Sequence, residues 1–343
     1  MVQNKSLIFV EPVPAGTYPV AGKHLKQTSD EFDLEQSLPA GSILVKTKVL
    51  SLDPYMRSRL RAPGHKSYVP EFTLEKPLQN FGVGEVLKAG EGATVQPGTL
   101  VYGTFDFSEY VVFDAEAVKA LRPFDNKEQL PLSTWVGAAG MPGQTAAVGL
   151  SQIGKPQKGE TIFVSSASGA VGQMVIALAH RVGLKVIAAA GSDEKVEILK
   201  SKLGVEFAFN YKRRLQTTNI KEFLSKHEYQ IYWDNVAGET LEAVLDTIAV
   251  RGRIIACGAA SSYNAQPHGV RNLFNVVSKE LHYEGFIVLN RDIGNFYDDI
   301  PKALAKGEFT QPIEHITKGL DNGEAFVELL SGGNIGKAVI SLE

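Results

Sequence analysis

Residues 165–172 form a short stretch of small residues and glycine between two apolar runs. The run before it, 161–164, is β-branched and apolar as in a buried parallel strand, and the run after it, 171–184, has helical periodicity. Gly169 lacks a Cβ that would block a phosphate, and Gly172 would let the helix pack closely on the strand. Because backbone N–H groups and the positive end of the helix would face the anion, this stretch predicts the pyrophosphate site of a redox enzyme that uses a nicotinamide dinucleotide.

The glycine pattern alone leaves a second interpretation open. The first glycine of the usual G-x-G-x-x-G pattern is replaced by Ala167. A strand-to-helix turn of small residues in any other α/β protein would look much the same. The choice of cofactor therefore has to be inferred from the residues that follow the glycine turn along the chain.

The end of the next expected strand, 185–190, favours NADPH over NADH. An NAD site usually has an acidic residue there, about 20 residues beyond the glycine turn, to bind the ribose 2′-hydroxyl. Here Gly191 and Ser192 follow the strand, with Lys195 one helical turn further on. This set suits a 2′-phosphate, which a carboxylate would repel. Ser192 is also a typical helix N-cap, and capping is compatible with phosphate binding.

Length and charge predict two domains and argue against a nucleic-acid-binding or membrane protein. A chain of 343 residues exceeds the usual size of one hydrophobic core, so two domains are expected. The net charge of −3 and the lack of a basic patch predict no nucleic-acid partner. No apolar run approaches the roughly 20 residues of a membrane helix, and the first residues lack a signal-peptide core. We therefore expect a cytoplasmic protein without a membrane partner.

The cysteine and histidine pattern predicts no metal site. Cys257 is the single cysteine, so neither an intrachain disulfide nor a four-cysteine zinc site is possible. The 7 histidines are far apart and show no H-E-x-x-H spacing. Cys257 ends an apolar run, 253–257, and is interpreted as a small buried residue rather than a nucleophile. No G-x-S-x-G nucleophile turn is present either.

The patterning predicts an α/β fold in two parts. Strand-like runs punctuated by glycine and proline predict an antiparallel, barrel-like domain over residues 1–139. Helical and strand-like runs then alternate, which predicts a doubly wound parallel sheet over 140–305. The tail, 306–343, is β-like again at 337–341 and is expected to rejoin the first domain. The expected strands are 7–10, 42–50, 82–87, 99–102, 110–113, 161–164, 185–190, 207–210, 230–234, 253–256 and 284–288.

Motifs along almost the whole chain resemble one family. They are Asp53-Pro54-Tyr55-Met56-Arg57, Gly140-Met141-Pro142-Gly143-Gln144-Thr145-Ala146, Ala167-Ser168-Gly169-Ala170-Val171-Gly172, Gly191-Ser192-Asp193-Glu194-Lys195-Val196, Phe209-Asn210-Tyr211-Lys212, Asp234-Asn235-Val236, Cys257-Gly258-Ala259 with Ser262-Tyr263-Asn264, and Gly333-Asn334-Ile335-Gly336-Lys337. In this order they resemble the zinc-independent medium-chain dehydrogenase/reductases. Within that superfamily they are most similar to the leukotriene B4 12-hydroxydehydrogenase, prostaglandin reductase and alkenal double-bond reductase group.

The resemblance implies a fold, a reaction and a set of cofactor contacts. The fold is a GroES-like β-barrel catalytic domain completed by the C-terminal segment, with a Rossmann domain between, usually in a homodimer. The reaction is NADPH-dependent reduction of the carbon–carbon double bond of an α,β-unsaturated aldehyde or ketone. The implied cofactor-binding residues are Gly169, Ala170, Val171, Gly172, Ser192, Lys195, Tyr211, Asn235, Cys257, Gly258, Ala259, Tyr263, Phe286, Ile287, Val288 and Asn334.

Some positions depart from the family pattern or have a simpler explanation. Ala237-Gly238 stands where Gly-Gly is more usual, and residues 61–72 and 267–273 do not match. These two segments are expected to be substrate-facing loops, so the mismatch leaves substrate identity open. Tyr211 would otherwise be read as a strand-end residue, and Asn334 as a turn residue.

Two tyrosines are the candidate catalytic residues. Hydride addition to the β-carbon of an enone develops negative charge on the carbonyl oxygen, which then needs a hydrogen-bond donor. A tyrosine hydroxyl keeps its proton at neutral pH and can donate it. Tyr263, just past a strand end, is the first candidate, acting directly or by positioning the nicotinamide ribose. Tyr55, from the catalytic domain, is the second. Each could instead be structural, as a cofactor-stacking aromatic or a turn residue, and the α-carbon proton is expected from solvent.

Two other functions remain open on the sequence. An enzyme of this fold could reduce quinones or the carbonyl group of ketones, or oxidise an alcohol. Product identity separates these reactions, because ene reduction leaves the carbonyl intact. A non-catalytic NADPH-binding or redox-sensing protein would keep the pocket without turnover.

Overall fold

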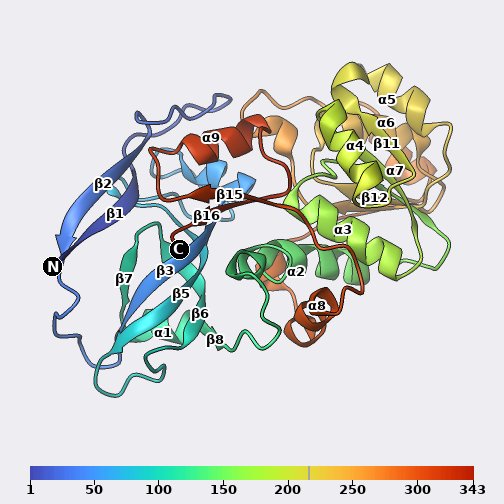
Figure 1. Cartoon of the computed structure of the whole chain (residues 1–343). Helices are drawn as coiled ribbons and strands as arrows, with labels where there is room; N and C mark the ends of the chain where they lie inside the picture. Colours follow the sequence, from blue (N-terminus) through green and yellow to red (C-terminus); the bar gives the residue numbers. More distant parts are fainter. Residues whose placement is uncertain (215–216) are drawn as a thin grey trace. The chain divides into compact units, whose positions relative to one another are not determined.

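The computed structural model describes residues 1–214 and 217–343, and the chain divides into two compact units. The first unit comprises Met1–Gly137, Glu314–Asn334 and Ala338–Glu343. The second comprises Ala138–Ile313 and Ile335–Lys337. Figure 1 shows the chain coloured by sequence.

The first unit is built from antiparallel strands. Its elements are β1 (Val2–Phe9), β2 (Leu25–Phe32), β3 (Ile43–Ser51), η1 (Pro54–Arg59), β4 (Lys76–Pro77), β5 (Gln79–Ala89), β6 (Leu100–Asp106), β7 (Tyr110–Phe113), α1 (Ala115–Ala120), β8 (Arg122–Phe124), η2 (Leu132–Val136), β15 (Glu314–Lys318), α9 (Glu324–Ser331) and β16 (Lys337–Ser341). One sheet has the order β2-β1-β4, and the other has the order β15-β16-β3-β5-β6-β8, with β7 also pairing with β3. The red β16 thus lies beside the blue β3 in Figure 1, so the end of the chain completes a sheet begun near its start.

Burial of apolar side chains explains why these segments are strands. In β3 and β5 apolar residues such as Val45 and Val86 are buried, and they join one core with Leu7, Phe105 and Phe326. β2 has few apolar residues, and much of its length is exposed. Its sequence therefore lacks the alternation by which a strand is recognised, and it was missed for that reason.

The second unit contains the doubly wound sheet that the sequence predicts. Its elements are α2 (Met141–Val148), a π-helical turn η3 (Gly149–Gly154), β9 (Thr161–Val164), α3 (Ala170–Arg181), β10 (Lys185–Ala190), α4 (Asp193–Ser201), β11 (Phe207–Asn210), η4 (Tyr211–Arg214), α5 (Thr217–Leu224), β12 (Ile231–Asp234), α6 (Gly238–Thr247), β13 (Arg253–Ala256), η5 (Ala260–Ser262), α7 (Phe274–Ser278), β14 (His282–Gly285), η6 (Val288–Asn290) and α8 (Phe296–Ala305). The six strands pair in parallel in the order β11-β10-β9-β12-β13-β14. The predicted fold class is confirmed.

Side chains alternate between the two faces of this sheet. Phe163 and Tyr232 belong to a cluster with residues of α5 and α6, including Leu224 and Val244. On β12 the next residue, Trp233, meets the π-helical turn instead: a Cβ on Gly149 would lie 2.5 Å from the indole. Only glycine allows this close approach. The π-helical turn therefore covers the Trp233 face of the sheet, while α5 and α6 cover the Tyr232 face.

One expected strand is shifted. The strand expected at 284–288 lies at His282–Gly285, and a 3₁₀ turn occupies Val288–Asn290. The apolar run Phe286–Val288 suggested the wrong register, because these residues follow the strand rather than pair within it. β14 is at the edge of the sheet, where pairing on one side alone gives a weaker pattern.

Candidate active site

The candidate site lies at the carboxyl edge of the parallel sheet. Strand β9 has β10 on one side and β12 on the other, so the strand order reverses between β9 and β12. Ligands of open α/β sheets bind in the crevice at such a point, beyond the carboxyl ends of the strands. The predicted cofactor residues in 165–172, 191–195 and 257–263, and Asn235, follow β9, β10, β13 and β12 respectively, so the fold brings all four groups to this edge.

The glycine turn has the local geometry that a phosphate needs. Gly169 is the N-cap of α3, and the N–H groups of the first helical turn, from Ala170 to Gly172, have no partner within the helix. A Cβ on Gly172 would lie 2.6 Å from the carbonyl oxygen of Ser166, so this position requires glycine for packing. A Cβ on Gly169 would meet nothing closer than 3.4 Å, which leaves open space where an anion can approach.

Ala167 shows why the missing first glycine is tolerated. Its side chain is completely buried, and its N–H donates to the carbonyl oxygen of Ala189 at 2.9 Å. The methyl group therefore packs inside the protein and leaves the phosphate approach open.

Two lysines, Lys195 and Lys212, lie beside the end of β10, and we call this part of the site the basic corner. Ser192 is the N-cap of α4, and its hydroxyl accepts from the Lys195 N–H at 3.2 Å, so the expected capping role is present. A Cβ placed on Gly191 would lie 3.4 Å from both the Tyr211 hydroxyl and the Lys212 Cε. Burial and the nearby Lys212 ammonium lower the pKa of Lys195. A bound phosphate would relieve this repulsion, so the residues fit a 2′-phosphate.

Lys212 is a residue that sequence reasoning missed. It stands next to Tyr211 in the matching motif, and that adjacency was the one available signal. The fold brings η4 beside the end of β10 because β11, which precedes it, pairs with β10 up to Asn210 opposite Ala190. The second positive charge strengthens the preference for a phosphorylated ribose.

Asn235 is held by the end of β9. Its Nδ2 donates to the Ser165 carbonyl oxygen at 2.7 Å, and its backbone N–H donates to the Ser165 hydroxyl at 3.0 Å. Its Oδ1 accepts from the Trp233 indole N–H at 3.0 Å. These bonds tie together the two strand ends that border the crevice.

Asp234 is a second residue that the sequence analysis did not single out. It is 1 % exposed, and its Oδ1 accepts from Val236 N at 2.9 Å, Ala237 N at 2.7 Å and the Tyr232 hydroxyl at 2.8 Å. Burial raises its pKa. The carboxylate shapes the turn after β12, where Ala237 has φ 59° and ψ −150°. This conformation is normally reserved for glycine, so the departure from Gly-Gly costs backbone strain that the Asp234 bonds help to offset.

The segment after β13 is anchored to the same turn. The N–H groups of Cys257 and Gly258 donate to the Asp234 carbonyl oxygen at 2.9 and 3.0 Å. Tyr263 follows η5 and is half-buried, and its hydroxyl lies 3.5 Å from where a Cβ on Gly258 would stand. The Tyr263 side chain thus returns toward the end of β13, so that its hydroxyl lies near Gly258. The neighbouring Cys257 and Ala259 are in the same segment, and Ala259 is half-buried. Burial and Asp234 raise the pKa of the Cys257 thiol to about 12, so the thiol stays protonated.

The last predicted cofactor segment of this unit follows β14. The Phe286 ring packs edge-on against Trp233, with ring centroids 6.2 Å apart. Val288 is buried, whereas Ile287 is partly exposed. Phe286 thereby lies near the end of β12, while the neighbouring Ile287 has surface left for other contacts.

Tyr55 and Asn334 belong to the first unit. The Tyr55 hydroxyl donates to Asn80 Oδ1 at 2.6 Å, and Asn80 Nδ2 donates to Asp53 Oδ2 at 2.8 Å. Burial and the Asp53 carboxylate raise the pKa of Tyr55, so its hydroxyl stays protonated. Its hydrogen is engaged with Asn80, so Tyr55 would have to exchange this bond before it could donate to a substrate. Asn334 is buried.

Three arginines of the Tyr55 segment hold the surrounding loops, and the sequence analysis missed this role. Arg57 donates to the carbonyl oxygens of Pro14 and Thr17. Arg59 donates to the carbonyl oxygens of Pro70 and Gln79. Arg61 donates to the Val69 carbonyl oxygen and pairs with Glu71 at 3.0 Å. The expected substrate loop, residues 61–72, is therefore fixed from its base by Arg59 and Arg61.

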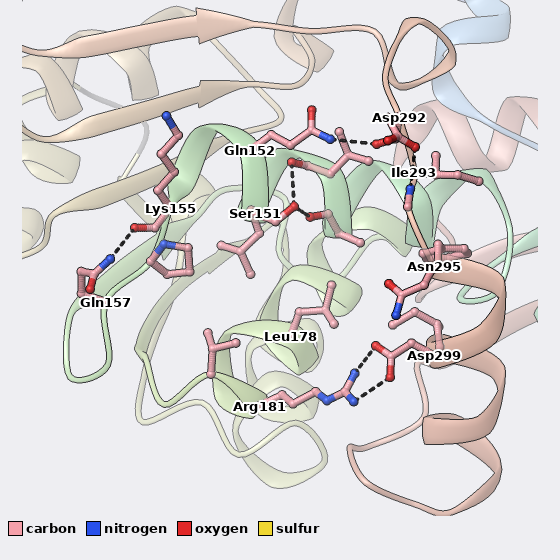
Figure 2. Close-up of a pocket in the computed structure, with 18 residues that line it drawn as sticks. Ser151, Gln152, Lys155, Gln157, Leu178, Arg181, Asp292, Ile293, Asn295 and Asp299 are labelled. Carbon is pink, nitrogen blue, oxygen red and sulfur yellow. Dashed lines mark hydrogen bonds and ion pairs between the residues drawn. The ribbon is translucent and has the colours of Figure 1, made fainter.

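A separate pocket of about 780 Å³ lies in the second unit, bordered by η3, α3 and α8 (Figure 2). Its rim carries the paired side chains Arg181 and Asp299, 2.7 Å apart, and Gln152, whose Nε2 donates to the Asp292 carbonyl oxygen. The α3 residues that line it, Leu178 and Arg181, are at the helix C-terminus. The glycine turn is at the other end of this helix of about 18 Å, so the pocket is distinct from the candidate cofactor site.

The described residues contain neither a cluster typical of a metal site nor a helix that could span a membrane. Across residues 1–214 and 217–343, no cluster of three or more histidine, cysteine or acidic side chains has the arrangement of a metal site. Within the same residues no helix is both long enough and apolar enough to span a bilayer.

Two domain families match the chain. Residues 26–121 match the N-terminal domain of oxidoreductase, and residues 170–306 match the zinc-binding dehydrogenase family. An NADP-dependent oxidoreductase, RED1, of Cochliobolus heterostrophus is 39% identical over 100% of this chain and 98% of its own. A 2-alkenal reductase (NADP(+)-dependent) of Nicotiana tabacum is 38% identical over 99% of this chain and 97% of its own. The crystal structure of CurA from Vibrio vulnificus with NADPH has a TM-score of 0.87 at 30% identity and covers 99% of both chains.

The fold and these relatives define an NADP-dependent oxidoreductase, and the prediction of NADPH as the cofactor is confirmed. The chain belongs to the medium-chain dehydrogenase/reductases, in the group that includes the NADP-dependent 2-alkenal reductase.

Proposed function

We propose that this enzyme reduces the carbon–carbon double bond of α,β-unsaturated aldehydes and ketones. The observation that carries the proposal is the Tyr263 hydroxyl, which lies beside Gly258 at the carboxyl edge of a sheet that also presents a phosphate-binding turn. A neutral hydroxyl at this edge provides the donor that a developing enolate needs. The similarity to a named 2-alkenal reductase over nearly the whole chain supports the same reaction.

When NADPH is bound, it would supply the hydride that adds to the β-carbon of the substrate. The Tyr263 hydroxyl donates a hydrogen bond to the carbonyl oxygen as negative charge develops there, or acts through the nicotinamide ribose. Tyr55 is the second donor, after release from Asn80. Solvent provides the proton for the α-carbon. Because no charged acid or base changes state, the residues stabilise charge and position the substrate.

The proposed cofactor contacts are those brought to the carboxyl edge. The first turn of α3, from Gly169 to Gly172, binds the pyrophosphate, and Ser192, Lys195, Tyr211 and Lys212 bind the 2′-phosphate. The remaining proposed dinucleotide contacts are Asn235, Cys257, Gly258, Ala259, Tyr263, Phe286, Ile287, Val288 and Asn334. No metal takes part, as the scattered histidines and single cysteine indicate.

The reaction is tested by incubating the purified enzyme with a simple conjugated enone and NADPH in the presence of a metal chelator. We expect oxidation of NADPH and a saturated ketone identified by mass spectrometry, with a lower rate when NADH replaces NADPH. An allylic alcohol would instead assign a carbonyl reductase. Turnover of quinones alone would assign a quinone reductase, and dinucleotide binding without consumption of any of these substrates would assign a binding or sensing role.

We propose a cytoplasmic location, which cell fractionation tests.

We propose a homodimer as the assembled form. β14 is an edge strand, and large apolar side chains are exposed close to it in sequence, among them Phe274 (74%), Val277 (69%) and Leu289 (64%). Open edges and exposed apolar groups favour pairing with a second chain. Light scattering should give the mass of two chains, and Val277→Glu should shift it toward one. A single-chain mass at micromolar concentration would contradict the dimer.

A further inference from the structure

Gln173 is a completely buried amide in α3 that no step of the proposed reaction uses. Its Nε2 donates to the Ser168 carbonyl oxygen at 2.8 Å, and its Oε1 accepts from the Ile313 N–H at 2.8 Å. Ser168 is in the glycine turn, whereas Ile313 is 140 residues from Gln173 in sequence. The side chain therefore bridges the turn to a distant segment of the same unit.

A second segment supports the same peptide. The Gly336 N–H donates to the Ser168 carbonyl oxygen at 2.9 Å, and Gly169 and Gly336 form an isolated parallel bridge. The Lys337 N–H in turn donates to the Ile313 carbonyl oxygen at 2.9 Å. The Ser168 carbonyl thus accepts two hydrogen bonds, one from Gln173 and one from Gly336, which use both of its lone pairs.

Gly336 shows how closely these segments are packed. Its φ is +77°, and a Cβ there would lie 1.9 Å from the Ile313 carbonyl oxygen and 3.1 Å from Gln173 Nε2. Glycine is required both for the backbone conformation and for the space. Gly336 of the C-terminal motif is therefore required because its backbone packs closely against Ile313 and Gln173 while it donates to the glycine turn.

We propose that Gln173 is a positioning residue that fixes the Ser168–Gly169 peptide and thereby sets the direction of the first N–H groups of α3 toward the pyrophosphate. The proposal rests on the proposed role of this turn in cofactor binding. Rotation of that peptide would turn the N-cap and displace the donors, and such sites tolerate only about 0.5 Å of misplacement. Because the pyrophosphate is common to both dinucleotides, Gln173 should affect NADP and NAD alike.

Gln173→Met tests this, since methionine fills a similar volume without either hydrogen bond. Dissociation constants of NADP⁺ and NAD⁺ are measured by titration calorimetry well below the melting temperature. We expect both constants to rise about 10-fold, which corresponds to about 1.4 kcal/mol. Their ratio should stay unchanged within about 2-fold. Unchanged constants in the folded variant would overturn the proposal, and so would a change confined to NADP⁺.

Tyr229→Phe is the matched control. The Tyr229 hydroxyl is hydrogen-bonded to Thr247 at 2.6 Å in the same unit, away from the turn. Its loss should lower the melting temperature and leave both dissociation constants unchanged. Equal weakening of binding by the control would reduce the role of Gln173 to general stability and overturn the proposal.

Gln173→Glu keeps the shape and provides a variant with a pH-dependent signature. A protonated carboxyl can still donate to the Ser168 carbonyl oxygen and accept from the Ile313 N–H, whereas an ionised carboxylate repels that carbonyl. Burial raises the pKa of such a carboxyl. The NADP⁺ dissociation constant, divided by the wild-type value at the same pH, should be near one at pH 5 and rise toward pH 8. A ratio that does not change with pH would contradict the proposal.

Binding and turnover separate this inference from the proposed reaction. If the wild-type enzyme binds NADP⁺ but does not reduce enones, the proposed reaction fails while the Gln173 effect remains measurable. If enones are reduced and Gln173→Met binds both dinucleotides normally, the inference fails alone.

Discussion

Lys195→Ala is expected to weaken NADPH binding by about 10- to 100-fold and to leave NADH binding within about 2-fold. Hydrogen bonds to charged groups contribute roughly 1.5–3 kcal/mol, and each 1.4 kcal/mol changes affinity tenfold. NADH lacks the 2′-phosphate, so it does not lose this contact. Measuring both dissociation constants by fluorescence titration isolates the phosphate contribution. Equal losses for the two cofactors would contradict the assignment of Lys195.

The same experiment has a matched control and a pH dependence. Lys200→Ala removes an exposed lysine from the same helix, and it should change neither constant. Lys212→Ala should lower NADPH affinity in the same direction as Lys195→Ala. Burial and Lys212 lower the pKa of Lys195 below its usual 10.5. As pH rises through this lowered pKa the ammonium loses its charge, so the preference for NADPH should fall at a lower pH than for an ordinary lysine.

Tyr263→Phe is expected to lower kcat by about 100- to 1,000-fold, the usual effect of removing one donor to a developing oxyanion. NADPH affinity should change little, because the ring remains. The measurement is steady-state turnover of a conjugated enone, with the NADPH dissociation constant determined separately. A loss of turnover without a loss of binding identifies a contact made in the transition state. An unchanged kcat would make Tyr263 a packing residue.

Tyr55→Phe provides the comparison. Tyr55 is the second candidate and its hydroxyl donates to Asn80, so we expect Tyr55→Phe to lower kcat only modestly. Loss of that buried hydrogen bond should lower the melting temperature as well. A larger loss of turnover for Tyr55→Phe would reverse the order of the two candidates.

The sequence alone determined the features that depend on local pattern. Strands 161–164, 185–190, 207–210 and 253–256 lie where they were expected, because short apolar runs between turn signals are sufficient to mark buried parallel strands. The glycine turn and Ser192 were also identified locally, since a helix N-terminus is encoded by neighbouring residues. The family motifs then gave the cofactor and the class of enzyme.

The tertiary structure alone decided what joins distant parts of the chain. Gln173 and Ile313 meet across 140 residues, and Lys212 approaches the end of β10 only because β11 pairs there. The shift of β14 and the missed β2 have the same origin, since an edge strand is set by its partner more than by its own pattern. Local periodicity encodes which residues form an element. Which buried polar groups satisfy one another depends on the packed fold, because their partners come from elsewhere in the chain.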